Sequence, residues 1–191
     1  MLSASRITDE IDWRSCDLSA LDLSAYPSNL VDYIDFDSKT YWPAASKMPP
    51  GIDLESVMET GKNPGLGVRG LHAQGIDGRG ISIAIIDQEL LTTHQEYADR
   101  LARYEQQDLS SRQEAYMHGA AVASIAVGKT VGVAPKANLF YIAGVFRMEG
   151  ERFDARPITQ ALQRIIQMNK RLPMQEKIRV VSYLEDSQSK I

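Results

Sequence analysis

The run ISIAII at residues 81–86 constrains the fold more than any other stretch of the sequence. It is rich in isoleucine, and the glycine-containing turn GIDGRG at 75–80 precedes it. A short run of this kind is typical of a strand that is buried on both faces, as in parallel sheets. The run ends on Asp87. A residue at the carboxyl end of a parallel strand lies at the edge where open α/β sheets hold their ligands and reactive groups.

Strands and helices alternate in the sequence after this run. KANLFYIAGV at 136–145 and KIRVVSYL at 177–184 predict two further strands. HGAAVASIAVG at 118–128 predicts a tightly packed helix of small residues, and a second helix is predicted over 154–172. The order strand, helix, strand, helix, strand predicts parallel pairing with right-handed crossovers. The expected fold class is therefore α/β.

The helix predicted over 154–172 has a clear periodicity of 3.6 residues. Asp154 is a suitable N-cap for this helix. The apolar face that we expect it to bury comprises Ile158, Leu162, Ile165, Ile166 and Leu172.

Composition narrows the class of protein. The chain has 191 residues, of which 43% are hydrophobic, enough to form the core of one domain with or without an extension. The net charge of −4 and the lack of a dense basic stripe argue against a nucleic-acid partner. Cys16 is the only cysteine, which excludes an internal disulfide framework and a cysteine-rich zinc site. The sequence shows no apolar leader and no apolar run of membrane-spanning length, so we expect a cytoplasmic protein without a membrane partner.

The first part of the chain differs from the rest. Residues 1–50 lack the periodicity of core elements, and the echo of CDLSA in LDLSA at 16–25 is too short for a repeat coil. KMPPG at 48–52 breaks regular structure. We therefore predict an irregular N-terminal extension over residues 1–50, followed by a domain over residues 51–191.

Two glycine-containing patterns do not predict a nucleotide site. GIDGRG precedes its strand, whereas a dinucleotide-binding fingerprint follows a strand and opens a helix. VGKT at 127–130 resembles the end of a phosphate-binding loop, but Ala123 stands where that loop requires its first glycine. No cofactor is predicted.

Asp87 and His118 form the most informative pair in the sequence. Asp87 ends the first core strand, and His118 opens the small-residue helix beside Gly119. In a parallel sheet both would face the same crevice, and small residues let the helix lie close to the strand. A carboxylate there can hold an imidazole in one tautomer and leave its other nitrogen free to act as a base.

The wider sequence resembles the subtilisin-like serine peptidases, the subtilase family. The segments GIDGRGISIAIIDQELLTTHQEY and MHGAAVASIAVGKTVGVAPKANLFYIAGV carry the resemblance, which extends over about residues 65–183. In that family a strand ends on the catalytic aspartate, a variant of H-P-E-[YF] follows, and a helix begins H-G-T-x-V-A and runs to G-V-A-P. The positions that correspond are Gly80, Asp87, His94, Glu96, His118, Gly119, Val122, Ala123 and Gly132–Pro135.

The chain departs from the family pattern next to the matched residues. Gln88 and Glu89 follow the aspartate where the family has [TS]-G, Gln95 replaces a proline, and Ala120 replaces a threonine. These replacements affect the surroundings of the Asp–His pair. The family often binds calcium, and Glu96 falls where it can place a ligand. The connection that follows the small-residue helix is short for the family's calcium loop, so no metal site is predicted.

The family's serine nucleophile arrives in a G-T-S-x-x-x-P segment, which this sequence does not contain. Ser182 lies within an apolar strand without an elbow or a helix behind it, and we do not predict it to be the nucleophile. The resemblance therefore implies a three-layer subtilisin-like fold, incomplete at the C-terminus, over residues 51–191. It implies that Asp87 and His118 are two of the three catalytic groups, with His118 as general base and acid and Asp87 as its orienting partner. On this resemblance we predict a distance of about 2.6 to 3.2 Å between the two side chains.

The resemblance implies a serine endopeptidase that hydrolyses bonds in peptide or protein substrates, and predicts that this chain is inactive alone. Two alternatives remain open at this point. In the first, the chain is a non-catalytic relative that keeps the scaffold to bind a partner. In the second, it is half of a split or truncated protease whose C-terminal half is supplied in trans. We predict that His94 lies outside the Asp–His pair, as a turn or packing residue.

Overall fold

The computed structural model describes residues 11–63, 65–107, 115, 117–144, 148–149, 152–153 and 155–183. The chain divides into two compact units, Met1–Pro64 and Gly65–Ile191. The sequence suggested a boundary near residue 50. In the structure the boundary lies between Pro64 and Gly65. Helix α1 (Leu54–Lys62) therefore belongs to the first unit, where its Val57 lines a pocket together with Val31. The proposed cap Asp154 lies outside the described residues.

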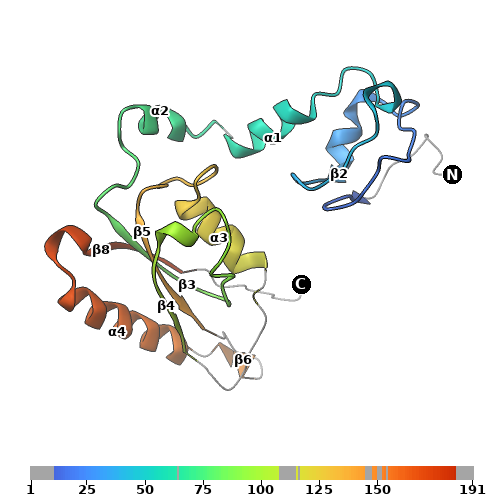
Figure 1. The fold of residues 1–191 in the computed structure, drawn as a ribbon. Helices are drawn as coiled ribbons and strands as arrows, with labels where there is room; N and C mark the ends of the chain where they lie inside the picture. Colours follow the sequence, from blue (N-terminus) through green and yellow to red (C-terminus); the bar gives the residue numbers. More distant parts are fainter. Residues whose placement is uncertain are drawn as a thin grey trace. The chain divides into compact units, whose positions relative to one another are not determined.

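The second unit contains a parallel four-stranded sheet (Figure 1). Its strands are β3 (Ser82–Asp87), β4 (Leu101–Gln106), β5 (Asn138–Ala143) and β8 (Ile178–Tyr183), in the order β4-β5-β3-β8. All three pairings are parallel. The three strands predicted from the sequence are thus neighbours in one sheet, and the α/β fold class is confirmed. Strand β4 was not predicted.

One face of the sheet packs against helix α3 (Met117–Val127). Alternate strand residues point to this side, so that Ile85 of β3 and Leu139 and Tyr141 of β5 share a cluster with Ala123 of the helix. The small side chains of α3 let its axis approach the strands closely. The predicted Asp–His pair comes from these two layers, with Asp87 at the end of β3 and His118 in α3.

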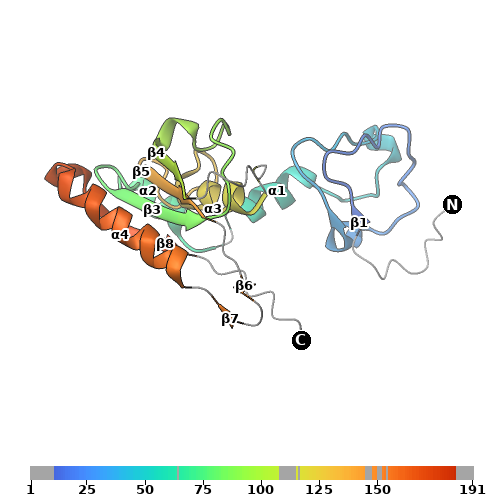
Figure 2. The same ribbon diagram turned by 90° about the horizontal axis from the view of Figure 1, so that it is seen from below.

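The opposite face packs against helix α4 (Arg156–Arg171). Ala84 and Ile86 of β3 alternate with Ile85 and join Ile165 and Met168 of the helix in a second cluster. Figure 2, turned by 90° from the first view, shows α4 running alongside β3 and β8. The second unit therefore has three layers, with the sheet between α3 and α4, as the family resemblance implied.

The buried face of α4 differs from the predicted one. Leu162 and Ile166, which we expected to be buried, are 40% and 55% exposed. The helix instead buries Ala161, Ile165 and Met168, which follow one another at the i, i+4, i+7 spacing of a single stripe. The prediction is confirmed for Ile165 and wrong for Leu162 and Ile166, because these two lie to one side of the stripe that faces the sheet.

An ion pair ties α4 to strand β4. The guanidinium of Arg164 donates from Nε and Nη2 to the two carboxylate oxygens of Glu105, at 2.7 and 2.8 Å. These hydrogen bonds lower the pKa of Glu105 below its usual value, and a further hydrogen bond from Arg103 acts in the same direction. A bidentate pair of this kind fixes the orientation of the helix on the sheet.

The ion pair predicts an acid-sensitive contribution to stability. Because the pKa of Glu105 is lower in the folded than in the unfolded state, its contribution is fully present above about pH 5 and is lost as the pH falls through the folded pKa. We expect the free energy of unfolding to fall less steeply below pH 5 in the Glu105→Gln variant than in the wild type. Urea unfolding at successive pH values measures this slope. Glu176→Gln, which removes an exposed carboxylate of the same unit, should retain the wild-type slope; equal slopes in all three proteins would contradict the prediction.

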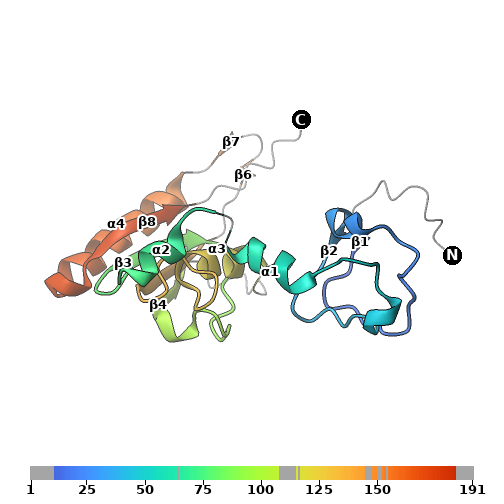
Figure 3. The ribbon, with the colours of Figure 1, turned by 90° about the horizontal axis from the view of Figure 1, so that it is seen from above.

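The first unit is small and is held together by apolar and aromatic side chains. Its regular elements within the described residues are short: β1 (Ile11–Asp12), η1 (Ser28–Tyr33), β2 (Ile34–Asp35), η2 (Ala45–Lys47) and α1. Figure 3 shows β1 and β2 side by side, and they pair in parallel. Leu23, Leu30 and Ile34 are buried, and Trp13 and Trp42 meet edge to face beside them. Residues 1–50 thus contain a compact core that the sequence pattern did not reveal.

Short connecting elements complete the described part of the second unit. They are α2 (Val68–Ala73), η3 (Ala98–Arg100), the antiparallel pair β6 (Met148–Glu149) and β7 (Arg152–Phe153), and η4 (Met174–Glu176). Helix α2 is attached to the unit by its His72, whose Nε2 lies 2.9 Å from the carbonyl oxygen of Val133.

The sheet should form without the first unit. Each hydrophobic cluster of the described residues draws all its members from one unit, so removing residues 1–64 deletes no side chain of the sheet's core. We expect a chain of residues 65–191 to keep the amide chemical shifts of β3, β5 and α3. Overlaid ¹⁵N–¹H correlation spectra of the full and shortened chains test this. Loss of shift dispersion in the shortened chain would show that the sheet needs the first unit.

Candidate active site

Asp87 lies at the carboxyl end of the central strand β3, where the sequence placed it. Its side chain is only 2% exposed. The strand delivers it there because Ile85 and Ile86 are buried on opposite faces, which fixes the register of β3 between its neighbours β5 and β8. A buried carboxylate needs partners that satisfy its charge.

His118 supplies such a partner from the first turn of α3. Its Nδ1 lies 2.9 Å from Oδ1 of Asp87, within the predicted range. Because a carboxylate oxygen only accepts hydrogen bonds, this contact assigns the proton to Nδ1 and leaves the lone pair on Nε2. The His118 side chain is 41% exposed, so the imidazole is accessible to a reacting group while the carboxylate behind it is not.

The backbone fixes the position of Asp87 on both sides. The amide of Gln88 donates to Oδ1 of Asp87 at 2.6 Å, and the amide of Gly144 donates to its carbonyl oxygen at 2.9 Å. Oδ1 thus receives both described hydrogen bonds, while Oδ2 is buried and has no hydrogen-bond partner among the described residues. The orientation of the carboxylate therefore comes from Oδ1.

Gly119 lets α3 approach this turn. A Cβ atom at position 119 would lie 2.5 Å from the hydroxyl of Tyr141 and 3.1 Å from the carbonyl oxygen of Gln88. Only glycine fits, because backbone and a buried side chain occupy the space that any other residue would need. The close approach brings His118 within hydrogen-bond distance of Asp87.

Tyr141 supports the turn from below. It is buried on β5, and its hydroxyl donates to the carbonyl oxygen of Gln88 at 2.6 Å. Burial, followed by the negative charge of Asp87, raises the pKa of Tyr141, so the phenol keeps the proton that it donates. Tyr141 was not among the site residues predicted from the sequence, because in KANLFYIAGV it occupies one position of an apolar strand. Its polar end was the available signal, since a buried tyrosine hydroxyl requires a partner.

The other residues that were singled out lie in structural positions. His94 stacks on Tyr97, with ring centroids 5.1 Å apart, and its Nδ1 accepts from the amide of Glu96. The two carboxylate oxygens of Glu96 accept hydrogen bonds from the hydroxyl and the amide of Thr130, both at 2.9 Å. These bonds connect the segment between β3 and η3 to the residues that follow α3. Ser182 is half-buried within strand β8, opposite Ile85.

No metal site emerges in the part of the chain that the structure describes. Within it, no three His, Cys, Asp or Glu side chains gather as ligands for an ion. Glu96 uses both carboxylate oxygens for Thr130. Likewise, none of the helices in the described ranges has the length and the apolar character that crossing a bilayer requires.

A half-exposed imidazole, held by a buried carboxylate at the carboxyl edge of a parallel sheet, is the arrangement that orients a histidine base in a catalytic triad. The comparison with protein families gives the class its name. The model of the subtilase family matches residues 78–183, which include all four strands of the sheet, and the chain belongs to this family. The comparison with curated proteins gave no match. The family is one of serine peptidases that act on peptides and proteins.

Proposed function

We propose that Asp87 and His118 are two members of the catalytic triad of a subtilisin-like serine endopeptidase. The single observation that supports this most strongly is the 2.9 Å contact between His118 Nδ1 and Asp87 Oδ1 in a subtilase sheet. Asp87 holds the tautomer of His118 in which Nε2 is free. It also stabilises the imidazolium that forms when Nε2 takes a proton.

The proposed reaction is peptide-bond hydrolysis through an acyl-enzyme. Nε2 of His118 removes the proton of a serine hydroxyl while the oxygen attacks the scissile carbonyl. The imidazolium then gives this proton to the leaving amine, the C–N bond breaks, and the acyl group remains on the serine. A water molecule, deprotonated by the same nitrogen, then attacks the ester carbonyl; the bond between the acyl carbon and the serine oxygen breaks, and the imidazolium returns the proton to that oxygen, which releases the acid product and regenerates the serine.

We further propose that the serine comes from residues outside this sequence. The G-T-S-x-x-x-P segment is not in the chain, and Ser182 is a half-buried residue within a strand. The substrate is a peptide or protein, as for the family. On this proposal residues 1–191 are inactive alone, and a C-terminal half in the same or another polypeptide completes the site.

A second candidate function is a non-catalytic subtilase-like binding module. The replacement of the family's [TS]-G by Gln88 and Glu89 directly after Asp87 favours it. The retained hydrogen bond between Asp87 and His118 favours catalysis, because a binding module does not require an oriented imidazole.

A labelling experiment separates these functions. The chain is incubated with a fluorophosphonate probe and with casein, first alone and then with a C-terminal subtilase polypeptide that carries the G-T-S-x-x-x-P segment; this mixture is termed the complemented enzyme. We expect no labelling or turnover by the chain alone, and labelling of the added serine in the mixture. Labelling of the chain alone would mean that the nucleophile lies within residues 1–191. A mixture in which the added polypeptide binds the chain but no labelling or turnover occurs would favour the non-catalytic module.

A further inference from the structure

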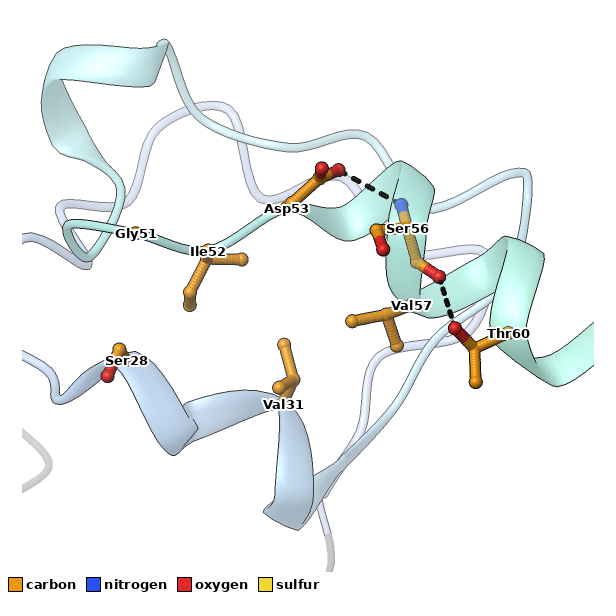
Figure 4. A pocket seen from close by; sticks show the side chains of 8 residues that line it. All are labelled: Ser28, Val31, Gly51, Ile52, Asp53, Ser56, Val57 and Thr60. Atoms are coloured by element: carbon orange, nitrogen blue, oxygen red, sulfur yellow. Dashed lines mark hydrogen bonds between the residues drawn. The ribbon is translucent and has the colours of Figure 1, made fainter.

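The first unit contains a pocket that the proposed catalytic function does not use (Figure 4). It lies between η1 and the start of α1 and has a volume of about 370 Å³. The side chains of Val31, Ile52 and Val57 point toward one another across it, from three different segments. These three residues form apolar walls that belong to a single compact unit.

The rim of the pocket is polar and carries one charge. Asp53 and Ser56 lie on the α1 side, and Ser28 lies on the η1 side. Asp53 is the N-cap of α1, and its Oδ1 accepts from the amide of Ser56 at 2.9 Å. Among the residues that line the pocket, Asp53 is the only one with a formal charge. A lining of apolar side chains with one carboxylate and three hydroxyl groups beside them, those of Ser28, Ser56 and Thr60, suits a long side chain with an apolar stem and a cationic end.

The charge of the whole unit points the same way. Residues 1–64 contain eleven Asp and Glu but five Lys and Arg, a net charge of −6, whereas residues 65–191 contain fourteen acidic and sixteen basic residues, a net charge of +2. The negative charge of the chain is therefore concentrated in the first unit. A field of this sign attracts cationic partners and repels acidic ones.

We infer that this pocket binds a lysine side chain of a basic peptide segment. The four-carbon stem lies along Val31, Ile52 and Val57, and the ammonium group stays at the wet rim beside Asp53, with the hydroxyl groups as further acceptors. Lysine suits this arrangement because its charge is compact and its stem is unbranched. The site is a docking site for a basic segment of a partner protein, and none of its residues is among those proposed for catalysis.

The test uses the full chain and three blocked heptapeptides that differ only at the central residue. The residue is lysine, norleucine, which keeps the apolar stem without the charge, or glutamate. Amide chemical shifts in ¹⁵N–¹H correlation spectra report binding at Val31 and Val57. We expect the lysine peptide to shift these signals with a Kd of about 1 to 10 mM, as for a small ligand at an exposed site. The norleucine peptide should bind at least about threefold more weakly, and the glutamate peptide should not bind.

Asp53→Asn is the decisive variant. Asparagine is as good an N-cap as aspartate, so the variant removes the charge while it preserves the start of α1. We expect it to raise the Kd of the lysine peptide about three- to fivefold, the effect of losing one exposed ion pair. Asp22→Asn, which makes the same charge change outside the pocket, should alter the Kd by less than about twofold. Equal Kd values for lysine and norleucine, equal effects of the two variants, or shifts away from Val31 and Val57 would each overturn the inference.

Discussion

Replacement of His118 by alanine is expected to lower kcat of the complemented enzyme by about a million-fold, the loss measured when subtilisin loses its catalytic histidine. The reason is that the serine hydroxyl then has no base at hydrogen-bond distance, and the leaving amine has no proton donor. Asp87→Ala should cost less, about 10⁴-fold, because the imidazole remains but loses its orientation. Initial rates of peptide hydrolysis at saturating substrate measure both effects.

His94→Ala provides the matched control. It removes the same type of side chain, from a turn in which His94 stacks on Tyr97 and contacts the amide of Glu96. We expect kcat of this variant to remain within about threefold of the wild type, the range expected for a change in packing outside the site. A loss of similar size in the His94 and His118 variants, with both proteins folded by circular dichroism, would contradict the assignment of the base.

Leu139→Ala is expected to lower the free energy of unfolding of the second unit by about 2–5 kcal/mol. Leu139 lies in the middle layer on β5 and is fully buried in the cluster between the sheet and α3. Its truncation removes apolar contacts and leaves a cavity that neighbouring strands cannot close without shifting their register. Urea unfolding monitored by far-ultraviolet circular dichroism gives the change.

Leu66→Ala is the control for this substitution. Leu66 is 76% exposed, so the same truncation should change the free energy of unfolding by no more than about 0.5 kcal/mol. If Leu139→Ala were as mild as Leu66→Ala, β5 would not be a core strand, and the position of the site at its carboxyl edge would lose its support.

The sequence predicted three of the four strands of the sheet because these are short, mostly apolar runs. β3 and β5 were both recognised, within two residues of their ends, since each is buried on two faces and reads as continuous hydrophobicity. Strand β4 has the sequence LARYEQ and lies at the edge of the sheet, where only part of it is covered. Its polar residues produce no such signal, so it was missed.

Only part of the candidate site could be predicted from the sequence. Asp87 and His118 could be placed from the end of a strand and the start of a helix, and the structure brings them within hydrogen-bond distance. The supporting hydrogen bond from Tyr141 could not, because it depends on the distance between β5 and the turn after β3. The close contact of Gly119 with Tyr141 and Gln88 likewise depends on how α3 packs against the sheet.

The core of the first unit could not be predicted from the sequence, for a different reason. Its elements are two to nine residues long and show no sustained period. Its stability comes from contacts between residues far apart in the sequence, such as the edge-to-face packing of Trp13 with Trp42 and of Phe36 with Trp42. A periodic pattern of apolar residues reveals the buried face of a helix or strand. Contacts between aromatic residues far apart in the sequence produce no such pattern.

The turn after β3 has a consequence for the energetics of a charged intermediate. Its carboxylate is held by one backbone amide at 2.6 Å, and its carbonyl by another at 2.9 Å, so neither group has to rotate when a positive charge appears on the neighbouring ring. In water, solvent dipoles would have to reorient around that charge, and this reorganisation accounts for much of the barrier. Here the dipoles are oriented by folding. For the proposed reaction, most of this reorganisation cost is therefore met when the chain folds and does not recur in each catalytic cycle.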